Sequence, residues 1–232
     1  MEESPAKRQC ISHTVNELNL CDACSLREIR PLIFKGTNID VQDINGQTTL
    51  HRMIFKAHGA AITFLLTKGA NVDIQDNEGN TAMHVSVTLN YTQYVRQLLE
   101  KNARPDLKNK AGETPLSLAA SKNVRIVKMI LTKGFFPEDR NYTLDIAAVN
   151  ACKERRLDIL ELLLKAGACA QTCDNQGNTL LHIAATFQHP RQHKMIQVLL
   201  ENGADGRAED ARGTYPKLTE AELKNFIQSG YQ

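Results

Sequence analysis

Asp43-Ile-Asn-Gly46-Gln-Thr48 is the stretch that decides the fold, because it returns along the chain at a nearly constant spacing. The same Asp-x-x-Gly-x-Thr pattern begins again at Asp76, at Asn109 with asparagine in the first place, and at Asp174. The first three copies are 33 residues apart. Such a period is typical of repeat proteins, in which one supersecondary unit is stacked on the next. The sequence therefore predicts a stacked repeat protein, a class whose extended surfaces hold partners.

Each copy predicts a turn followed by two helices. Glycine in the fourth place of the turn suits a backbone with positive φ, and the next threonine can cap a helix. Longer, more apolar second helices are expected at 62–66, 95–99, 126–131, 159–164 and 195–200. Each is followed by glycine or asparagine, the two residue types that best tolerate a left-handed C-cap. These residues are Gly69, Asn102, Gly134, Gly167 and Gly203.

A second pattern follows each turn. Three copies share threonine, two residues and histidine: Thr48-Thr49-Leu50-His51, Thr81-Ala82-Met83-His84 and Thr179-Leu180-Leu181-His182. The third copy reads Thr114-Pro115-Leu116-Ser117, and a further copy, Thr143-Leu144-Asp145-Ile146, lacks the turn. With its period, this pattern resembles the ankyrin repeat, whose signature is Thr-Pro-Leu-His-x-Ala. The resemblance runs from about residue 17 to about residue 210. It implies an all-α ankyrin-repeat solenoid with short β-turn or hairpin connections.

The resemblance also implies a division of the chain. We expect a disordered N-terminal tail at 1–12, an N-terminal capping unit at 13–42, five repeats within 43–209 and a C-terminal capping half-repeat at 210–232. The five repeats are 43–75, 76–108, 109–140, 141–173 and 174–209. Thr219–Ile227 is expected to form a closing helix. Phe135 and Phe136 are expected either to fill the gap left by the missing turn or to form an exposed contact.

Charge and composition restrict the class of partner. With 28 basic and 26 acidic residues, the chain has no broad basic footprint for nucleic acid. No run is long enough for a membrane span, and residues 1–15 lack the apolar core of a secretory signal. We therefore expect a cytoplasmic chain, with the nucleus as a second compartment, that binds another protein, no nucleic acid and no membrane, and is monomeric alone. Its six cysteines are expected to be free thiols.

Two groups of cysteines have sequence features of metal binding or of thiol reactivity. Cys21-x-x-Cys24 has zinc-ligand spacing, but the nearest similar pair, Cys169 and Cys173, lies about four repeats away, roughly 35 Å at ordinary helix packing distances. No metal or cofactor is therefore predicted, and Cys21 and Cys24 are expected to be small buried residues. Cys152 precedes Lys153, Arg155 and Arg156, and nearby positive charge raises thiol reactivity. We expect an exposed surface thiol there, or alternatively a thiol-regulated enzyme.

The three histidines of the recurring pattern are expected to be structural. The resemblance implies that His51, His84 and His182 bond to the turn and to the adjoining repeat. The chain has no phosphate-binding glycine loop, no paired carboxylates and no Gly-x-Ser-x-Gly elbow. An enzyme is not expected.

The resemblance places partner binding on the turn tips and on the exposed, concave face of the first helix of each repeat. Phe55, Leu89 and Phe187 are apolar residues in places where exposure is expected. Carried over by position, with the basic residues of the insertions added, the candidate partner-binding residues are Ile44, Asn45, Gln47, Phe55, Lys56, Asn77, Glu78, Asn80, Leu89, Lys110, Glu113, Lys122, Lys153, Arg155, Arg156, Asn175, Gln176, Asn178, Phe187 and Arg191.

Two insertions interrupt the period. About four extra residues lie between Ala148 and Leu157, and about three between Ala185 and Met195. Insertions in a solenoid project from one edge, which is often the binding edge. Here they predict either a basic ridge that binds an acidic or extended segment, or tolerated surface loops.

The function indicated is a non-enzymatic interaction module that acts as an adaptor, scaffold or inhibitor. The number of repeats resembles small ankyrin inhibitors of the IκB type, which sequester a transcription factor. The Asp-Ser-Gly-x-x-Ser phosphodegron and the acidic tail of such inhibitors are absent from the sequence.

Overall fold

The computed structural model describes residues 20, 23, 25–134, 140–186 and 191–219. The chain divides into two compact units, Met1–Pro115 and Leu116–Gln232, which we call unit 1 and unit 2 and describe separately. Several predictions lie outside the described residues: the 1–12 tail, Cys21 and Cys24, Phe135 and Phe136, Phe187, and all of the expected closing helix except Thr219. In the described part of the chain, no helix is long and apolar enough to cross a membrane.

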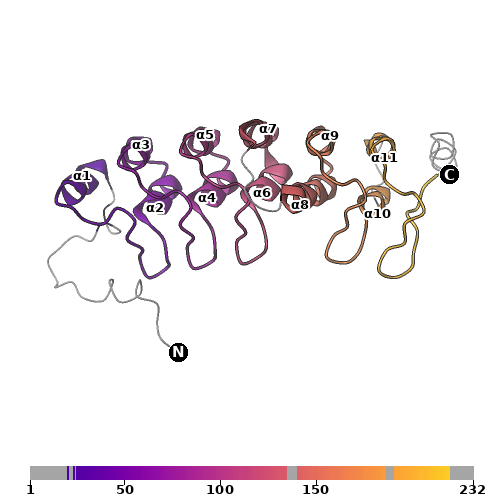
Figure 1. The fold of residues 1–232 in the computed structure, drawn as a ribbon, viewed down its shortest axis with the longest axis horizontal. Coiled ribbons are helices and arrows are strands. Elements are labelled where there is room, and N and C mark those ends of the chain that lie inside the picture. Colours follow the sequence, from indigo (N-terminus) through magenta and orange to yellow (C-terminus); the bar gives the residue numbers. More distant parts are fainter. Residues whose placement is uncertain (1–19, 21–22, 24, 135–139, 187–190, 220–232) are drawn as a thin grey trace, which may run out of the picture. The chain divides into compact units, whose positions relative to one another are not determined.

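Unit 1 is built from helix pairs joined by turns. Its helices are α1 (Leu26–Phe34), α2 (Thr49–Phe55), α3 (Gly59–Thr67), α4 (Ala82–Thr88) and α5 (Thr92–Glu100). Figure 1 shows α1, α3 and α5 in one row, α2 and α4 in a second row, and the turns beyond the second row. We call these rows the outer and inner helices. The first helix of each repeat is therefore an inner helix, next to the turns.

Unit 2 continues the same pattern. α6 (Pro115–Lys122), which begins at the division, is followed by α7 (Val124–Lys133), α8 (Arg140–Lys153), α9 (Leu157–Lys165), α10 (Leu180–Ala185) and α11 (Arg191–Glu201). Its outer helices are α7, α9 and α11, and its inner helices are α6, α8 and α10 (Figure 1). Isolated β-bridges join Gln42 to Thr48 in unit 1 and Cys173 to Thr179 in unit 2. The described residues form no longer strand, which confirms a helical fold with hairpin-like connections.

The inner helices begin at the threonine that follows each turn. In α4, the backbone N–H of His84 donates to Thr81 Oγ1 at 3.4 Å, and the backbone N–H of Thr81 donates to His84 Nδ1 at 3.1 Å. Nε2 of His84 therefore carries the proton, and it donates to the carbonyl of Glu113, in the next turn, at 3.1 Å. The predicted structural role of this histidine is confirmed: it caps its own helix and ties it to the next repeat.

The outer helices end at the predicted stops. Gly69, Gly134, Gly167 and Gly203 all have positive φ, and so does Asn102 at 59°. In this left-handed conformation, glycine and asparagine carry the smallest steric penalty. The C-caps predicted from sequence are confirmed.

The core of each unit lies between its two rows of helices. In unit 1 it contains fully buried leucines and isoleucines such as Ile62, Leu65 and Leu98. Ala119 and Ala147 are fully buried in unit 2, where small side chains allow helices to approach closely. This packing leaves the turn tips and parts of both rows of helices at the surface.

The fourth repeat departs from the others. Its extra residues do not form a loop, because α8 is 14 residues long whereas α2 and α4 have seven. The seven additional residues of α8 add about two helical turns, so the same face of the helix returns to the core. The prediction of an inserted loop is therefore wrong for this repeat. In the fifth repeat, residues 191–193 belong to the beginning of α11.

The fourth repeat also has its own connections. Asp145 occupies the place of the repeat histidine, and its Oδ1 accepts from the backbone N–H of Cys169 at 2.7 Å. In unit 1 the equivalent N–H groups, of Asn71 and Arg104, donate to Asp40 and Asp73 of the preceding connection. Asp145 thus supplies a carboxylate acceptor in the repeat that lacks the regular turn.

Candidate partner-binding surface

The turn tips are fixed by the first residue of the Asp-x-x-Gly pattern. Asp43 Oδ1 accepts from the backbone N–H groups of Asn45 at 2.8 Å and Gln47 at 2.9 Å. Asp76, Asn109, Asp174 and Asp210 accept two backbone bonds in the same way. The carboxylate or amide oxygen therefore holds the turn, and the residues between project outward.

Adjacent turns in unit 1 approach closely at the glycine. Gly46 has φ 74°, and a Cβ added there would lie 2.7 Å from the backbone nitrogen of Asn77. A Cβ on Gly79 would lie 2.9 Å from the nitrogen of Lys110. Glycine is thus required both for the backbone conformation and for the space.

Hydrogen bonds continue across these contacts. The backbone N–H of Asn77 donates to the carbonyl of Asn45 at 2.9 Å, and its side-chain amide donates to the carbonyl of Ile44 at 2.8 Å. The N–H of Lys110 donates to the carbonyl of Glu78 at 2.9 Å. The three tips of unit 1 therefore form one bonded row, so the side chains that project from it are held in place.

The first repeat carries the most exposed apolar groups of this surface. Ile44, at the tip of the first turn, is 91% exposed, and Phe55, at the end of α2, is 69% exposed. Single exposed apolar residues are common. Here two of them lie on the turn tip and inner helix of the same repeat, so they indicate a binding surface.

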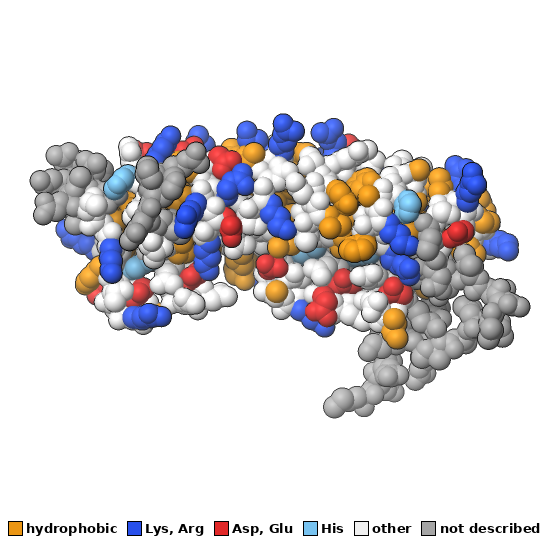
Figure 2. Space-filling model, turned by 180° about the vertical axis from the view of Figure 1, so that it is seen from behind, with side chains coloured by type: hydrophobic (Ala, Val, Ile, Leu, Met, Phe, Trp, Pro, Cys, Tyr) orange, Lys and Arg blue, Asp and Glu red, His pale blue; other side chains and the backbone are white. Residues whose placement is uncertain are grey.

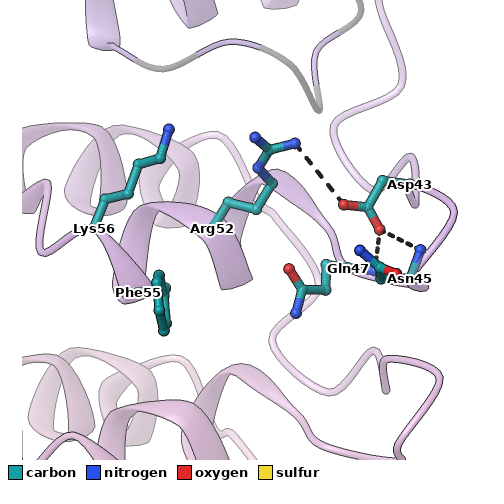
Figure 3. A pocket seen from close by; sticks show the side chains of 6 residues that line it. All are labelled: Asp43, Asn45, Gln47, Arg52, Phe55 and Lys56. Carbon is teal, nitrogen blue, oxygen red and sulfur yellow. Dashed lines mark hydrogen bonds and ion pairs between the residues drawn. The ribbon is translucent and has the colours of Figure 1, made fainter.

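A pocket of about 330 Å³ opens beside Phe55. Asp43, Asn45 and Gln47 line it from the turn, and Arg52, Phe55 and Lys56 line it from the end of α2, as Figure 3 shows. Arg52 Nη1 lies 3.9 Å from Asp43 Oδ2, which links the two walls. The structure thus joins four predicted residues, Asn45, Gln47, Phe55 and Lys56, with two that sequence reasoning missed. Arg52 could have been found from its helical spacing, since it lies four residues before Lys56.

The other predicted residues differ in exposure. In unit 1 the exposed ones are Asn77, Glu78 and Lys110, and the half-buried ones are Asn80, Leu89 and Glu113. In unit 2 the exposed ones are Lys122, Lys153, Arg155, Asn175 and Gln176, and the half-buried ones are Arg156 and Asn178. Leu89, at the C-cap of α4, is half-buried, so it does not offer the open apolar surface that its position predicts. Phe187 and the side chain of Arg191 lie outside what the structure describes.

The basic residues of the fourth repeat make contacts within unit 2. Lys153 Nζ lies 3.1 Å from Asp174 Oδ2, in the turn of the fifth repeat. Arg156 pairs with Asp158 at 3.1 Å and donates to the carbonyl of Lys122 at 3.0 Å. Lys153 therefore links consecutive repeats where the usual histidine is missing.

Cys152 is not the exposed thiol that its basic neighbours predict. Its side chain is fully buried in α8, with Sγ 3.4 Å from the carbonyl of Leu180 and 3.7 Å from Met195 Sδ. Burial raises the pKa of the thiol to about 12, and the positive charge of Lys153 offsets only part of that effect. A buried, protonated thiol is a poor nucleophile, so the interpretation of Cys152 as a reactive residue is wrong.

The titratable groups in the part of the chain that the structure describes do not assemble a metal site. No group of three or more His, Cys, Asp or Glu side chains among the described residues could hold a metal ion. Cys152, Cys169 and Cys173 are free thiols, the last two exposed. The surface thus offers apolar and charged side chains for contact.

Comparisons with known proteins agree with this architecture. The family model described as ankyrin repeats (3 copies) matches residues 20–109, 58–141, 97–168 and 140–210. A search of curated protein sequences gives no significant match.

Three solved structures share the fold. The ankyrin repeat domain of Bcl-3, described as a unique member of the IkappaB protein family, is 21% identical with a TM-score of 0.69, over 87% of this chain and 91% of that one. The human ASB11 ankyrin repeat domain is 23% identical with a TM-score of 0.67, over 89% and 94%. An ankyrin repeat domain from Acinetobacter baumannii AYE is 22% identical with a TM-score of 0.66, over 77% and 92%. Together with the family match over most of its length, the recurring turns, caps and helix pairs show that this chain belongs to the ankyrin-repeat family.

Proposed function

We propose that this chain is a non-enzymatic protein-binding module whose first repeat provides the main contact with its partner. Ankyrin repeats are in general protein–protein interaction modules. The single observation that carries the proposal is the pairing of Ile44, 91% exposed, with Phe55, 69% exposed, beside a pocket on the turn and inner helix of one repeat. Large apolar side chains at the centre of an interface contribute most of its binding energy.

The charges around Phe55 indicate the chemistry of the partner. Arg52 and Lys56 outnumber Asp43 in the lining of the pocket. We expect an extended partner segment that places an apolar side chain against Phe55 and a carboxylate near Arg52 or Lys56. The row of tips that continues through Asn77, Glu78 and Lys110 would extend the contact. The equivalent residues of unit 2, from Lys122 to Arg191, are proposed as a secondary contact.

Inhibition of a transcription factor is a narrower proposal within this class. Bcl-3 is described as a member of the IkappaB family. The ASB11 and bacterial domains match the chain nearly as well, so the likeness supports the shared fold and not this role in particular. Adaptor, scaffold and inhibitor are thus distinguished only by identifying the partner. We propose that the chain acts as a monomer in the cytoplasm or nucleus, where free thiols such as Cys169 and Cys173 are typical.

Affinity capture with matched variants tests the proposal. The baits are the intact chain, an Ile44→Ser/Phe55→Ser double variant, and a Tyr215→Ser control. Tyr215 is 58% exposed and lies in unit 2, outside the predicted binding residues, so the control removes an exposed ring that the proposal does not use. Substitutions at such exposed positions are expected to change stability by about 0.5 kcal/mol or less, and circular dichroism with thermal unfolding verifies the fold.

We expect at least one protein that is captured by the intact chain and by Tyr215→Ser but lost with the double variant. With purified partner, the double variant should weaken Kd by about 30-fold or more, because a true hot spot contributes about 2 kcal/mol. Capture of the same set by all three folded baits would exclude the first repeat as the main contact. Capture of nothing above an empty-tag control would contradict the binding function itself.

A further inference from the structure

Two phenylalanine rings form a separate feature on the outer helices of unit 1. Phe34, the last residue of α1, is 70% exposed, and Phe64 lies half-buried on the neighbouring outer helix α3. Their ring centroids are 6.3 Å apart, and the ring planes are tilted by 58°. Figure 2 shows hydrophobic surface next to Lys and Arg side chains at this end of unit 1.

Two cations lie over these rings. The guanidinium carbon of Arg30 is 5.5 Å from the centroid of Phe64. Lys68 Nζ is 5.0 Å from the centroid of Phe34 and 5.9 Å from that of Phe64. These distances are within the range of cation–π attraction, which holds the charges at the rings. We call Arg30, Phe34, Phe64 and Lys68 the aromatic–cation cluster.

The repeat itself provides a comparison, because residues 33 apart occupy equivalent places. Phe34 corresponds to Thr67, and Phe64 corresponds to Gln97. The lysine at the end of the outer helix, Lys68, recurs as Lys101. A lysine there is explained by the negative end of the helix dipole. The phenylalanines are not required by the repeat, since the next pair of outer helices has polar residues in their places.

The positive charge of this surface favours a partner segment that carries carboxylates. On α1 the exposed charged residues are Arg27, Glu28 and Arg30, and Lys35 follows at its C-cap. α3 contains no charged residue and is followed by Lys68. These two outer helices and their caps therefore carry four basic groups and one acidic group. An exposed ring surrounded by positive charge is complementary to an apolar side chain flanked by carboxylates.

We propose that the aromatic–cation cluster is a second docking site, which binds an acidic segment of a partner protein. The segment places one aromatic or aliphatic side chain against Phe34 and its carboxylates near Arg30 and Lys68. A membrane surface fits less well, because Phe64 is half-buried and only one ring remains to insert, whereas stable anchoring requires more than one such element.

This site is distinct from the first-repeat pocket. Phe55 lies on the inner helix α2, whereas the cluster lies on the outer helices α1 and α3. A substitution can therefore remove one binding surface and leave the other intact. A chain with both surfaces could hold two partner segments at once.

The test measures binding of fluorescein-labelled peptides to the purified full chain by fluorescence polarisation. The probes are short acidic peptides, each with one Phe, Trp or Leu among Asp, Glu, Ser and Gly, with two matched sets of controls. In one control set serine replaces the apolar residue, and in the other lysine replaces the acidic residues. Vesicles of phosphatidylserine and phosphatidylcholine test the membrane alternative by co-sedimentation.

Four variants separate the possible sites: Phe34→Ser, Lys68→Glu, Lys101→Glu and Phe55→Ser. Lys101→Glu is the matched control for Lys68→Glu, since it reverses the same charge one repeat later, where threonine and glutamine replace the rings. All four are compared with the intact chain by circular dichroism. We expect acidic peptides with an apolar residue to bind, and Phe34→Ser and Lys68→Glu each to weaken Kd by about tenfold or more. Lys101→Glu should leave it unchanged. In a chain that already carries Phe55→Ser, the two cluster substitutions should weaken Kd to the same extent, so that the first-repeat pocket does not contribute to the difference.

Several results would overturn the second site. Equal weakening by Lys68→Glu and Lys101→Glu would show unspecific charge attraction, and loss with Phe55→Ser would place the peptide in the first-repeat pocket. Binding to anionic vesicles but to no peptide would show a membrane surface instead. Absence of any peptide with Kd below about 100 μM would also reject the site. These outcomes are independent of the proposed function, because loss of partner with Ile44→Ser/Phe55→Ser is measured on another surface.

Discussion

Lowering the pH should reduce the free energy of unfolding of this protein, because the repeat histidine His84 is buried. Its ring is 1% exposed, its Nδ1 accepts from the backbone N–H of Thr81, and its Nε2 donates to the carbonyl of Glu113. Burial lowers the pKa of His84 from 6.5 to about 4. A proton added to Nδ1 would also replace the acceptor that Thr81 requires. The folded chain therefore resists protonation at a site that is protonated readily once the chain unfolds.

The sign and size of the effect follow from these two pKa values. Above pH 6.5 the histidine is neutral in both states, so its full contribution to stability is present. Between pH 6.5 and about 4 the unfolded state binds a proton that the folded state does not, so the free energy of unfolding falls as the pH falls. Each pH unit of difference between the two pKa values is worth about 1.4 kcal/mol, which gives about 3 kcal/mol for His84.

Urea unfolding followed by circular dichroism at a series of pH values measures this loss. His84→Gln is the informative variant, because glutamine cannot titrate while the other histidines remain. The variant should be less stable than the intact chain near neutral pH, and the difference should shrink by about 3 kcal/mol on acidification to about pH 4. A difference that stays constant over this range would refute the assignment of the acid sensitivity to His84.

Three further predictions concern the turns, the fourth repeat and Cys152. Gly79→Ala should cost more than the roughly 1–2 kcal/mol of a left-handed alanine, because its Cβ would also lie 2.9 Å from Lys110 N. Gly69→Ala, with φ +85° and no atom within 4 Å of the added Cβ, is the control; equal losses in urea unfolding would show that close approach of the turns is not limiting. Asp145→Ala should cost about 0.5–1.5 kcal/mol, because it removes the exposed hydrogen bond from the N–H of Cys169, whereas Asp145→Asn keeps an acceptor and should cost less. Thermal unfolding compares the two, and an equally damaging asparagine would contradict this role of the side chain. Cys152 should react with iodoacetamide more than about 100-fold more slowly than Cys169 and Cys173 in the folded chain near pH 8, and all three should react after denaturation, as measured by mass spectrometry. Comparable rates in the folded chain would contradict its burial.

The features predicted from sequence are those that depend on local chemistry. The glycine of each turn, the threonine cap and the left-handed stop are each determined by a few neighbouring residues. Gly46, Thr81 and Gly69 therefore have the conformations that the pattern predicts. Because the repeat returns several times, the positions that stay the same are those that the fold requires. These positions were enough to identify the family.

The features that sequence reasoning missed depend on contacts across the chain. The four extra residues of the fourth repeat were expected in a loop, but their helical continuation depends on which face α8 buries. The charges near Cys152 gave a wrong prediction, because burial of the sulfur has a larger effect on the pKa of the thiol than the charge of the adjacent Lys153. The turn pattern does not identify Phe34 and Phe64 as unusual, since the capping unit that contains Phe34 has no complete turn to align. Comparison with Thr67 and Gln97, one period later, would have identified them as departures.

The candidate binding surface was predicted in outline only. Position within the repeat placed Asn45, Gln47, Phe55 and Lys56 on the correct elements, and the structure adds Asp43 and Arg52 to the same pocket. Exposure could not be predicted, because it depends on the packing of neighbouring repeats. Lys56 and Leu89 occupy the same place after equivalent inner helices, yet Lys56 is exposed and Leu89 is half-buried.

Site-specific photo-crosslinking in cells tests the central claim most directly. Benzoylphenylalanine is introduced in place of Phe55 in one version of the full chain and in place of Lys101, an exposed residue next to the outer helix α5, in the control. If the first repeat binds the partner, the version with the probe at position 55 should give a discrete crosslinked protein that is absent at position 101. That product should decrease when Ile44→Ser is added. Identical crosslinking at both positions, or none at position 55, would contradict the account.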